Sequence, residues 1–128
     1  MNLEKITSRN NPLIKEMAKL ADKKYRTINN LFAFEGSKLM LEALNYGAPL
    51  EHIFVTEKAL SQLPVSDINC KITVVSDEVY NKLSFEKSPE GIFCVSKALD
   101  KIHNIYIINI NIIQKKQIFI EKNMIRCI

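Results

Sequence analysis

The sequence predicts an α/β fold, a small three-layer α/β/α domain around a four-stranded parallel or mixed sheet. Four short and continuously apolar segments alternate with segments whose apolar residues recur at helical spacing. This alternation is typical of buried strands joined by crossover helices. The chain has 128 residues, of which 47% are hydrophobic and 25% charged, and this composition is that of one ordinary globular domain.

The first half of the chain contains two expected helices and one strand. Asn11 is a good N-cap and Pro12 suits the first helical position, so a helix is predicted from Pro12 to about residue 24. A buried strand is expected at residues 31–34. The next helix is expected to be capped by Ser37 and to end at Gly47, which favours a left-handed conformation.

The second half of the chain continues the same alternation. Strands are predicted at residues 52–55, 71–75 and 92–95, and helices at residues 57–63 and 77–83. Ser76 is the expected cap of the helix at residues 77–83, and a turn is expected at residues 88–91.

Charge is distributed unevenly along the chain. Residues 1–26 hold seven Lys and Arg against three Asp and Glu, residues 27–97 hold six against nine, and residues 98–128 hold five against two. A basic N-terminal segment favours a polyanionic partner such as RNA or DNA, although a solvated helix face explains the same charges. The candidate RNA-binding residues are Ser8, Arg9, Asn11, Lys15, Lys19, Lys23 and Arg26.

Other chemistries find little support in the sequence. The two histidines lie fifty-one residues apart and the three cysteines are widely spaced, so neither a metal site nor a disulfide framework is expected. Glu35 follows a strand, where it is either a catalytic carboxylate or an acceptor for the first turn of the next helix; the second interpretation is favoured because no partner acid or base is visible. No catalytic residue is assigned. The polar N-terminus and the lack of a long apolar run predict a cytoplasmic protein without a membrane span.

Three motifs occur in order along the chain, namely ITSRNNPLIK, FAFEGSKLMLEAL and VYNKLSFEKSPEGIFCV. Over roughly residues 4–97 they resemble the N-terminal substrate-binding domain of the SpoU/TrmH-type RNA ribose 2′-O-methyltransferases. The resemblance implies a fold similar to the ribosomal-protein-like domains that bind RNA kink-turns. It also implies family-motif positions at Glu35, Gly36, Pro89 and Gly91. Family members usually carry Gln at the position of Glu90, so a weaker polyanion contact is expected in that turn.

In the family, a knotted catalytic domain that binds S-adenosylmethionine and forms homodimers follows this domain. Here residues 1–97 are expected to be the RNA substrate-binding domain, and residues 98–128 an atypical tail rich in Ile, Asn and Lys. Residues 106–109 resemble a remnant of the first catalytic strand. The resemblance therefore predicts a truncated or frame-shifted chain that binds no cofactor and is inactive alone, S-adenosylmethionine being expected only for the full-length family member.

The predicted function is recognition of structured RNA, either rRNA or tRNA, for a ribose 2′-O-methyltransferase. The expected partners include neither a membrane nor a metal, and a homodimer is possible. Two alternatives remain open at this point. In the first alternative, the chain is a stand-alone RNA-binding protein of the kink-turn type. In the second, it is a non-functional remnant or an oligomerisation module that associates through residues 105–113.

Overall fold

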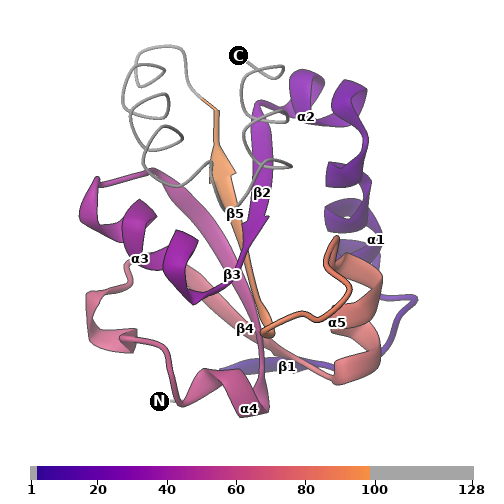
Figure 1. The fold of residues 1–128 in the computed structure, drawn as a ribbon. Helices are drawn as coiled ribbons and strands as arrows, with labels where there is room; N and C mark the ends of the chain where they lie inside the picture. The colour runs from indigo at the N-terminus through magenta and orange to yellow at the C-terminus, as the bar shows by residue number, and fades with distance from the viewer. Residues whose placement is uncertain (1–2, 99–128) are drawn as a thin grey trace.

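A five-stranded mixed sheet lies between two layers of helices (Figure 1) in the computed structural model, which describes residues 3–98. The strands are β1 (Glu4–Ile6), β2 (Leu31–Glu35), β3 (Leu50–Thr56), β4 (Lys71–Val75) and β5 (Ile92–Lys97). Their order is β1-β4-β3-β5-β2; β1, β4 and β3 are parallel, and β5 is antiparallel to both of its neighbours. The expected tail, with the segment at residues 105–113, lies outside the described residues.

Helices cover both faces of the sheet, which confirms the predicted three-layer class. The helices are α1 (Pro12–Ala18), α2 (Lys23–Asn29), α3 (Ser37–Asn45), α4 (Glu57–Leu60) and α5 (Asp77–Leu83), with 3₁₀ turns at Lys19–Ala21 and Val65–Asp67. α3 and α4 cover one face, and α1, α2 and α5 cover the other (Figure 1). No helix within residues 3–98 is long and apolar enough to span a bilayer.

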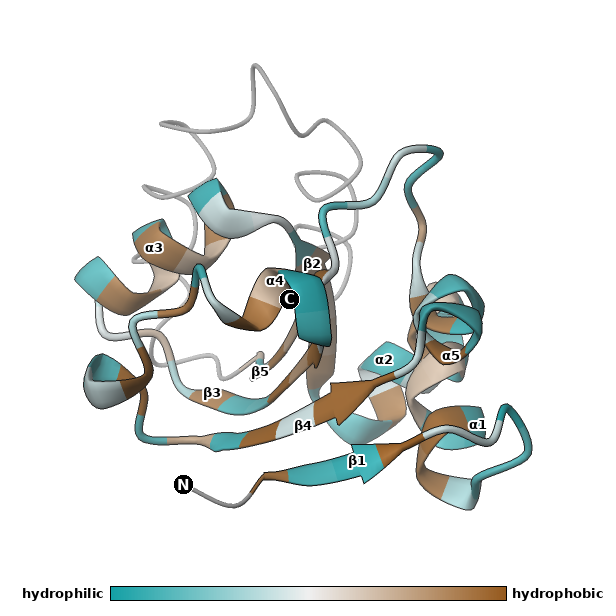
Figure 2. Cartoon of the chain, turned by 90° about the horizontal axis from the view of Figure 1, so that it is seen from below, coloured by the Kyte–Doolittle hydropathy of each residue, from teal (hydrophilic) through white to brown (hydrophobic). Residues whose placement is uncertain are grey.

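The apolar side chains form one core on each face of the sheet. Phe32, Met40 and Ile53 belong to the core beneath α3 and α4, whereas Phe54 and Phe93 belong to the core beneath α1 and α5. Successive strand residues point to opposite faces, so continuously apolar strands supply both cores. Figure 2 shows the resulting pattern, with hydrophilic residues on the outer turns of the helices and hydrophobic residues toward the sheet.

The strand count differs from the prediction because β1 was missed. β1 has three residues, of which only Ile6 is buried, and it lies at the sheet edge beside β4. An edge strand with one buried residue has no apolar run or alternation long enough to be recognised. The sheet therefore has five strands instead of four.

The single helix expected from Pro12 to residue 24 is divided. Asp22 adopts an extended conformation with φ −94° and ψ 124°, and its carboxylate accepts a hydrogen bond from the Lys24 amide. Asp22 thereby caps a separate helix, α2, which the sequence did not predict. Asn11 and Ser76 cap α1 and α5 as predicted.

The topology brings five loops together at one end of the sheet. Strands β1, β2, β3 and β4 end there and the antiparallel β5 begins there, as the pairing registers show. We call this end the carboxyl edge, comprising residues 7–11, 35–37, 56–58, 76–77 and 84–91. In open α/β sheets, ligands bind beyond the carboxyl ends of the strands, so the carboxyl edge is the candidate location of a binding site.

Candidate functional site at the carboxyl edge

The four family-motif positions lie together at the carboxyl edge. Gly36, after β2, donates its backbone N–H to the carbonyl of Ile92 across 2.9 Å. The amide of Thr56, at the end of β3, donates to the carbonyl of Gly91 across 3.0 Å. Backbone hydrogen bonds thereby join the segment before β5 to the ends of β2 and β3, which are distant from it in the sequence.

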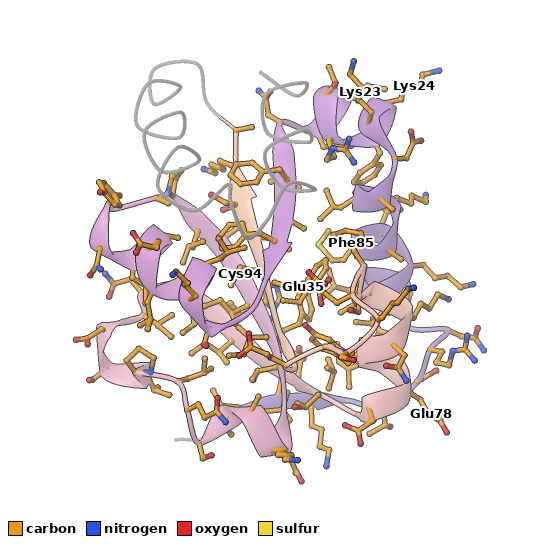
Figure 3. The ribbon with its side chains drawn as sticks, in the orientation of Figure 1. Lys23, Lys24, Glu35, Glu78, Phe85 and Cys94 are labelled. Carbon is orange, nitrogen blue, oxygen red and sulfur yellow. The ribbon has the colours of Figure 1, made fainter. Side chains whose placement is uncertain are left out.

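Glu35 is buried, with 4% of its surface exposed, and accepts three hydrogen bonds. The donors are the hydroxyl of Tyr80 at 2.8 Å, the hydroxyl of Ser84 at 2.7 Å and the backbone N–H of Phe85 at 2.6 Å. Figure 3 shows Glu35 beside Phe85. The expectation that Glu35 accepts from the first turn of the following helix was wrong, because its donors come from the end of α5 and the segment after it. Glu35 thus attaches the loop at residues 84–91 to β2.

The Tyr80 hydroxyl remains protonated in this arrangement. Burial raises the pKa of Tyr80 well above its usual value, and the adjacent Glu35 carboxylate raises it further. A protonated hydroxyl donates to the carboxylate, whereas a phenolate would repel it. The pair therefore fixes α5 against the end of β2.

Gly36 and Glu90 are in close contact at the start of α3. Gly36 is the N-cap residue, with φ +103°, and no side chain caps α3. Ser37, the expected cap, instead donates its hydroxyl to Glu90 Oε2 across 3.1 Å. Glu90 Oε1 lies only 2.7 Å from the position that a Cβ on residue 36 would occupy. A carboxylate at this place interacts favourably with the positive end of the helix dipole.

The loop at residues 7–11 reaches the same edge and is fixed by its own hydrogen bonds. Ser8 Oγ accepts from the Asn10 amide across 3.2 Å, and Asn11 Oδ1 accepts from the amides of Leu13 and Ile14 at the start of α1. The ammonium of Lys82 donates to the carbonyl of Arg9 across 2.9 Å, which ties the loop to α5. Ser8 and Asn11 thus shape the loop, while the Arg9 side chain is exposed.

The basic residues of α1 and α2 do not form one patch with this edge. Lys15, Lys19 and Lys23 are exposed, and Lys19 pairs with Glu16 at 3.2 Å. A hydrogen bond from Tyr25 and the Lys19 charge lower the pKa of Glu16. Figure 3 shows Lys23 and Lys24 at the opposite end of the domain from Glu78 of α5. The candidate residues Lys15, Lys19 and Lys23 fall within the single helix that the sequence predicted, but the break at Asp22 places Lys23 on a separate helix that lies away from the carboxyl edge.

Arg26 is placed differently from the other candidates. Only 3% of its surface is exposed, and its guanidinium donates to the carbonyl of Leu20 across 2.8 Å. A side chain enclosed beneath α2 is not presented to a polyanion. The expectation that Arg26 belongs to the RNA-binding surface therefore needs correction, because this residue holds α2 to the preceding 3₁₀ turn.

The sequence did not reveal a pocket of about 420 Å³ at the carboxyl edge. Its lining consists of Thr56, Lys58, Ala59, Gln62, Asp77, Tyr80, Asn81, Pro89, Glu90 and Gly91. A second hollow of about 370 Å³ shares Lys58 and Asp77 with it. The lining comes from three separate segments, of which only residues 89–91 carried a recognisable motif, so no local sequence signal identified the pocket. No group of three metal-ligating side chains occurs within residues 3–98.

Comparison with known proteins identifies relatives of this domain. A family model described as the MRM3-like substrate binding domain matches residues 11–94. The crystal structure of an RNA 2′-O ribose methyltransferase is 32% identical, with a TM-score of 0.66 over 76% of this chain and 38% of its own. No curated protein sequence matches the chain significantly.

Two further solved structures share the fold at lower identity. The AdoMet-bound rRNA methyltransferase from Sinorhizobium meliloti is 21% identical, with a TM-score of 0.64 over 74% of this chain and 36% of its own. The SpoU methyltransferase AviRb from Streptomyces viridochromogenes is 13% identical, with a TM-score of 0.61 over 69% of this chain and 36% of its own. The chain thus spans little more than a third of the length of these structures.

The family model covers more than half of the chain, including the carboxyl-edge loops at residues 35–37, 56–58, 76–77 and 84–91. The fold similarity extends over about three quarters of the chain. The chain therefore belongs to the MRM3-like substrate-binding domain family, whose fold it shares with RNA 2′-O-ribose methyltransferases of the SpoU/TrmH type.

Proposed function

We propose that this domain binds structured RNA, either rRNA or tRNA, as the recognition part of a ribose 2′-O-methyltransferase. The observation that carries the proposal is the convergence of the family-motif positions and the loop at residues 7–11 on the carboxyl edge of a substrate-binding-domain fold. Contacts to phosphates come from exposed cations, of which Arg9 lies at this edge and Lys15 and Lys23 lie on the helices that run away from it. Arg9, Lys15 and Lys23 make no ion pair with another residue between 3 and 98.

Recognition is assigned to this domain, and methyl transfer is not. The S-adenosylmethionine of the family needs a cleft that holds a charged sulfonium and a nucleoside. Gly36, Gly47 and Gly91 lie in three separate turns, so the described residues contain no glycine-rich loop of the kind that cradles a nucleotide cofactor. We therefore place cofactor binding outside residues 3–98, and we expect this part of the protein to act by positioning RNA.

The proposal is tested by the salt dependence of RNA binding. The full chain is titrated against a fluorescently labelled tRNA and a labelled rRNA stem-loop between about 50 and 200 mM salt. If three or four phosphates are neutralised, the logarithm of the association constant falls with the logarithm of salt concentration with a slope of roughly −3. A DNA duplex of equal length is the control for non-specific attraction. Absence of RNA binding at low salt, or a slope near zero, overturns the proposal.

A further inference from the structure

The pocket of about 420 Å³ lies between α4, α5 and the loop that precedes β5. Its inner wall is fixed by short contacts. Thr56 Oγ1 accepts a hydrogen bond from the Ala59 amide, and the Thr56 amide donates a hydrogen bond to the backbone carbonyl of Gly91. Gly91 has φ +94°, and a Cβ on it would lie 2.5 Å from Thr56 Oγ1. Because residue 91 has no side chain, its backbone packs directly against Thr56. This contact closes the inner wall of the pocket.

The outer lining is polar and is available to a ligand. The side chains of Lys58, Gln62, Asp77 and Asn81 are exposed, and none of them makes a hydrogen bond or ion pair with another residue of the described part of the chain. Asp77 and Asn81 lie four residues apart on α5 and therefore share one face of that helix. Together these groups present a carboxylate, two amides and an ammonium to one cavity.

The charges of the lining favour a neutral ligand over a phosphate. Asp77 and Glu90 contribute two carboxylates, and Lys58 contributes one ammonium. Two carboxylates around one cavity would repel a phosphate placed inside it. A nucleobase is neutral, offers donors and acceptors at its edge, and is read by proteins when it is unpaired and turned away from its neighbours.

We propose that this pocket binds an unpaired guanine base, an inference that rests on the RNA-binding function proposed above. The Asp77 carboxylate accepts hydrogen bonds from guanine N1–H and the N2 amine, the two adjacent donors of the Watson–Crick edge. Asn81 or Gln62 donates its amide N–H to guanine O6. Adenine presents no N1–H donor and cytosine presents only one amine, so neither satisfies a carboxylate in this bidentate way.

The second hollow gives the nucleotide that carries the base a place for its backbone, because two ammonium groups there, Lys5 and Lys58, offset the carboxylates of Glu57 and Asp77. It shares Lys58 and Asp77 with the pocket and is also lined by Lys5. Lys5 pairs with Glu57 at 2.8 Å, whereas Lys58 has no such partner among residues 3–98. Lys58 is therefore positioned between the two hollows to contact the phosphate next to the bound base.

The test uses the full chain and a stem-loop RNA whose loop contains one unpaired guanine. Matched RNAs carry adenine or inosine at that position, inosine lacking the N2 amine. We expect the guanine RNA to bind roughly tenfold or more tightly than the adenine RNA, with inosine in between. Asp77→Asn removes the preference. Glu78→Gln is the control, because Glu78 is an exposed neighbour on α5 that carries the same charge and does not line the pocket.

Mononucleotides separate the base from the RNA. In ¹⁵N-edited NMR spectra, GMP is expected to shift the amide signals of residues 56–62, 77–81 and 89–91, and AMP to leave them in place. Equal binding of all three RNAs, or equal effects of Asp77→Asn and Glu78→Gln, overturns the guanine pocket while leaving RNA binding intact. If GMP shifts these signals but the chain binds none of the RNAs, the guanine site is retained and the proposed RNA-binding function is overturned. Loss of both signals overturns both proposals.

Discussion

The hydroxyl of Tyr80 on α5 donates a 2.8 Å hydrogen bond to the carboxylate of Glu35, which lies 45 residues earlier at the end of β2. Both residues are buried, with exposed fractions of 2% and 4%. The same carboxylate accepts from Ser84 and from the Phe85 amide. One side chain therefore determines where α5 ends and where the loop toward β5 begins.

Replacing Glu35 is expected to destabilise the domain through the donors left without an acceptor. Glu35→Ala leaves the buried Tyr80 hydroxyl and the Phe85 amide unsatisfied, so the free energy of unfolding falls by about 3 kcal/mol. Glu35→Gln keeps the shape and one acceptor oxygen, and we expect a loss of about 1–2 kcal/mol. Urea denaturation of the full chain measures both values.

A double-mutant cycle isolates the Glu35–Tyr80 contact. Tyr80→Phe removes one donor while keeping the buried ring, Glu35→Ala removes the acceptor, and Glu35→Ala/Tyr80→Phe completes the cycle. We expect a coupling energy of about 1 kcal/mol, since the two side chains share a buried hydrogen bond to a charged group. Strictly additive losses would show that the 2.8 Å contact does not contribute to stability.

Gly36→Ala is expected to cost more stability than Gly47→Ala. Both glycines have positive φ, +103° and +68°, so both variants carry backbone strain of about 1 kcal/mol or more. Only at Gly36 does the added methyl group meet another atom, Glu90 Oε1 at 2.7 Å, whereas nothing lies within 4 Å at Gly47. Thermal unfolding of the two variants makes the comparison. Adding Glu90→Ala to Gly36→Ala should restore the steric part of the loss, and a failure to restore any of it would contradict the contact.

The sequence was sufficient to predict elements with a strong local signal. Strand β4 and helix α5 have the predicted bounds, because the β-branched residues 72–75 and a serine cap identify them without tertiary information. Strand β1 and the break at Asp22 were missed. One depends on pairing with β4, and the other on a single extended residue within a helical pattern.

The site was less accessible to prediction for a physical reason. Basic residues at helical spacing indicate a shared face only while the helix continues, and the break at Asp22 places Lys23 on a separate helix. The sequence of a basic segment also does not show which of its side chains is buried, so Arg26 could not be distinguished from its exposed neighbours. The pocket at the carboxyl edge results from the strand order, which brings Lys58, Asp77 and Glu90 together from distant segments.

Acid is expected to destabilise the domain through His52. Burial, together with the nearby Lys71 charge, lowers the pKa of His52 to about 4, while Glu4 opposes the change. The ring stacks on Phe54 with centroids 4.0 Å apart, and Nε2 lies 2.7 Å from Thr73 Oγ1. In the unfolded chain the imidazole binds a proton when the pH falls below its ordinary pKa of 6.5. Between this pH and about 4, the unfolded state therefore binds a proton that the folded state does not bind. Stability is therefore lost as the pH falls from 6.5 toward 4.

The measurement is the free energy of unfolding at about pH 7 and about pH 5. We expect His52 to account for a loss of about 2 kcal/mol between these values. His52→Gln, which retains a partner for Thr73, should reduce the pH dependence by that amount. His103→Gln changes the other histidine of the sequence and serves as the comparison. If the pH dependence is unchanged in His52→Gln, the neutral buried ring is not its source.

The contrast between Arg26 and Lys15 separates folding from RNA binding within one basic segment. Arg26 is buried and bonded to Leu20, so Arg26→Ala should lower the free energy of unfolding by about 2 kcal/mol. Lys15 is exposed and has no ion-pair partner within residues 3–98, so Lys15→Ala should change stability by less than about 0.5 kcal/mol. If the proposed RNA-binding function holds, Lys15→Ala weakens RNA binding and reduces the salt slope by about one.

Arg26→Lys completes this prediction, because it preserves the charge while replacing the planar guanidinium that reaches Leu20. A structural role predicts that Arg26→Lys loses stability and that its folded fraction binds RNA with unchanged affinity and salt slope. Denaturation curves give the folded fraction at the temperature of the RNA titration, so that the two effects are measured separately. A reduced salt slope in folded Arg26→Ala, recovered in Arg26→Lys, would instead mean that α2 opens to present this side chain to RNA.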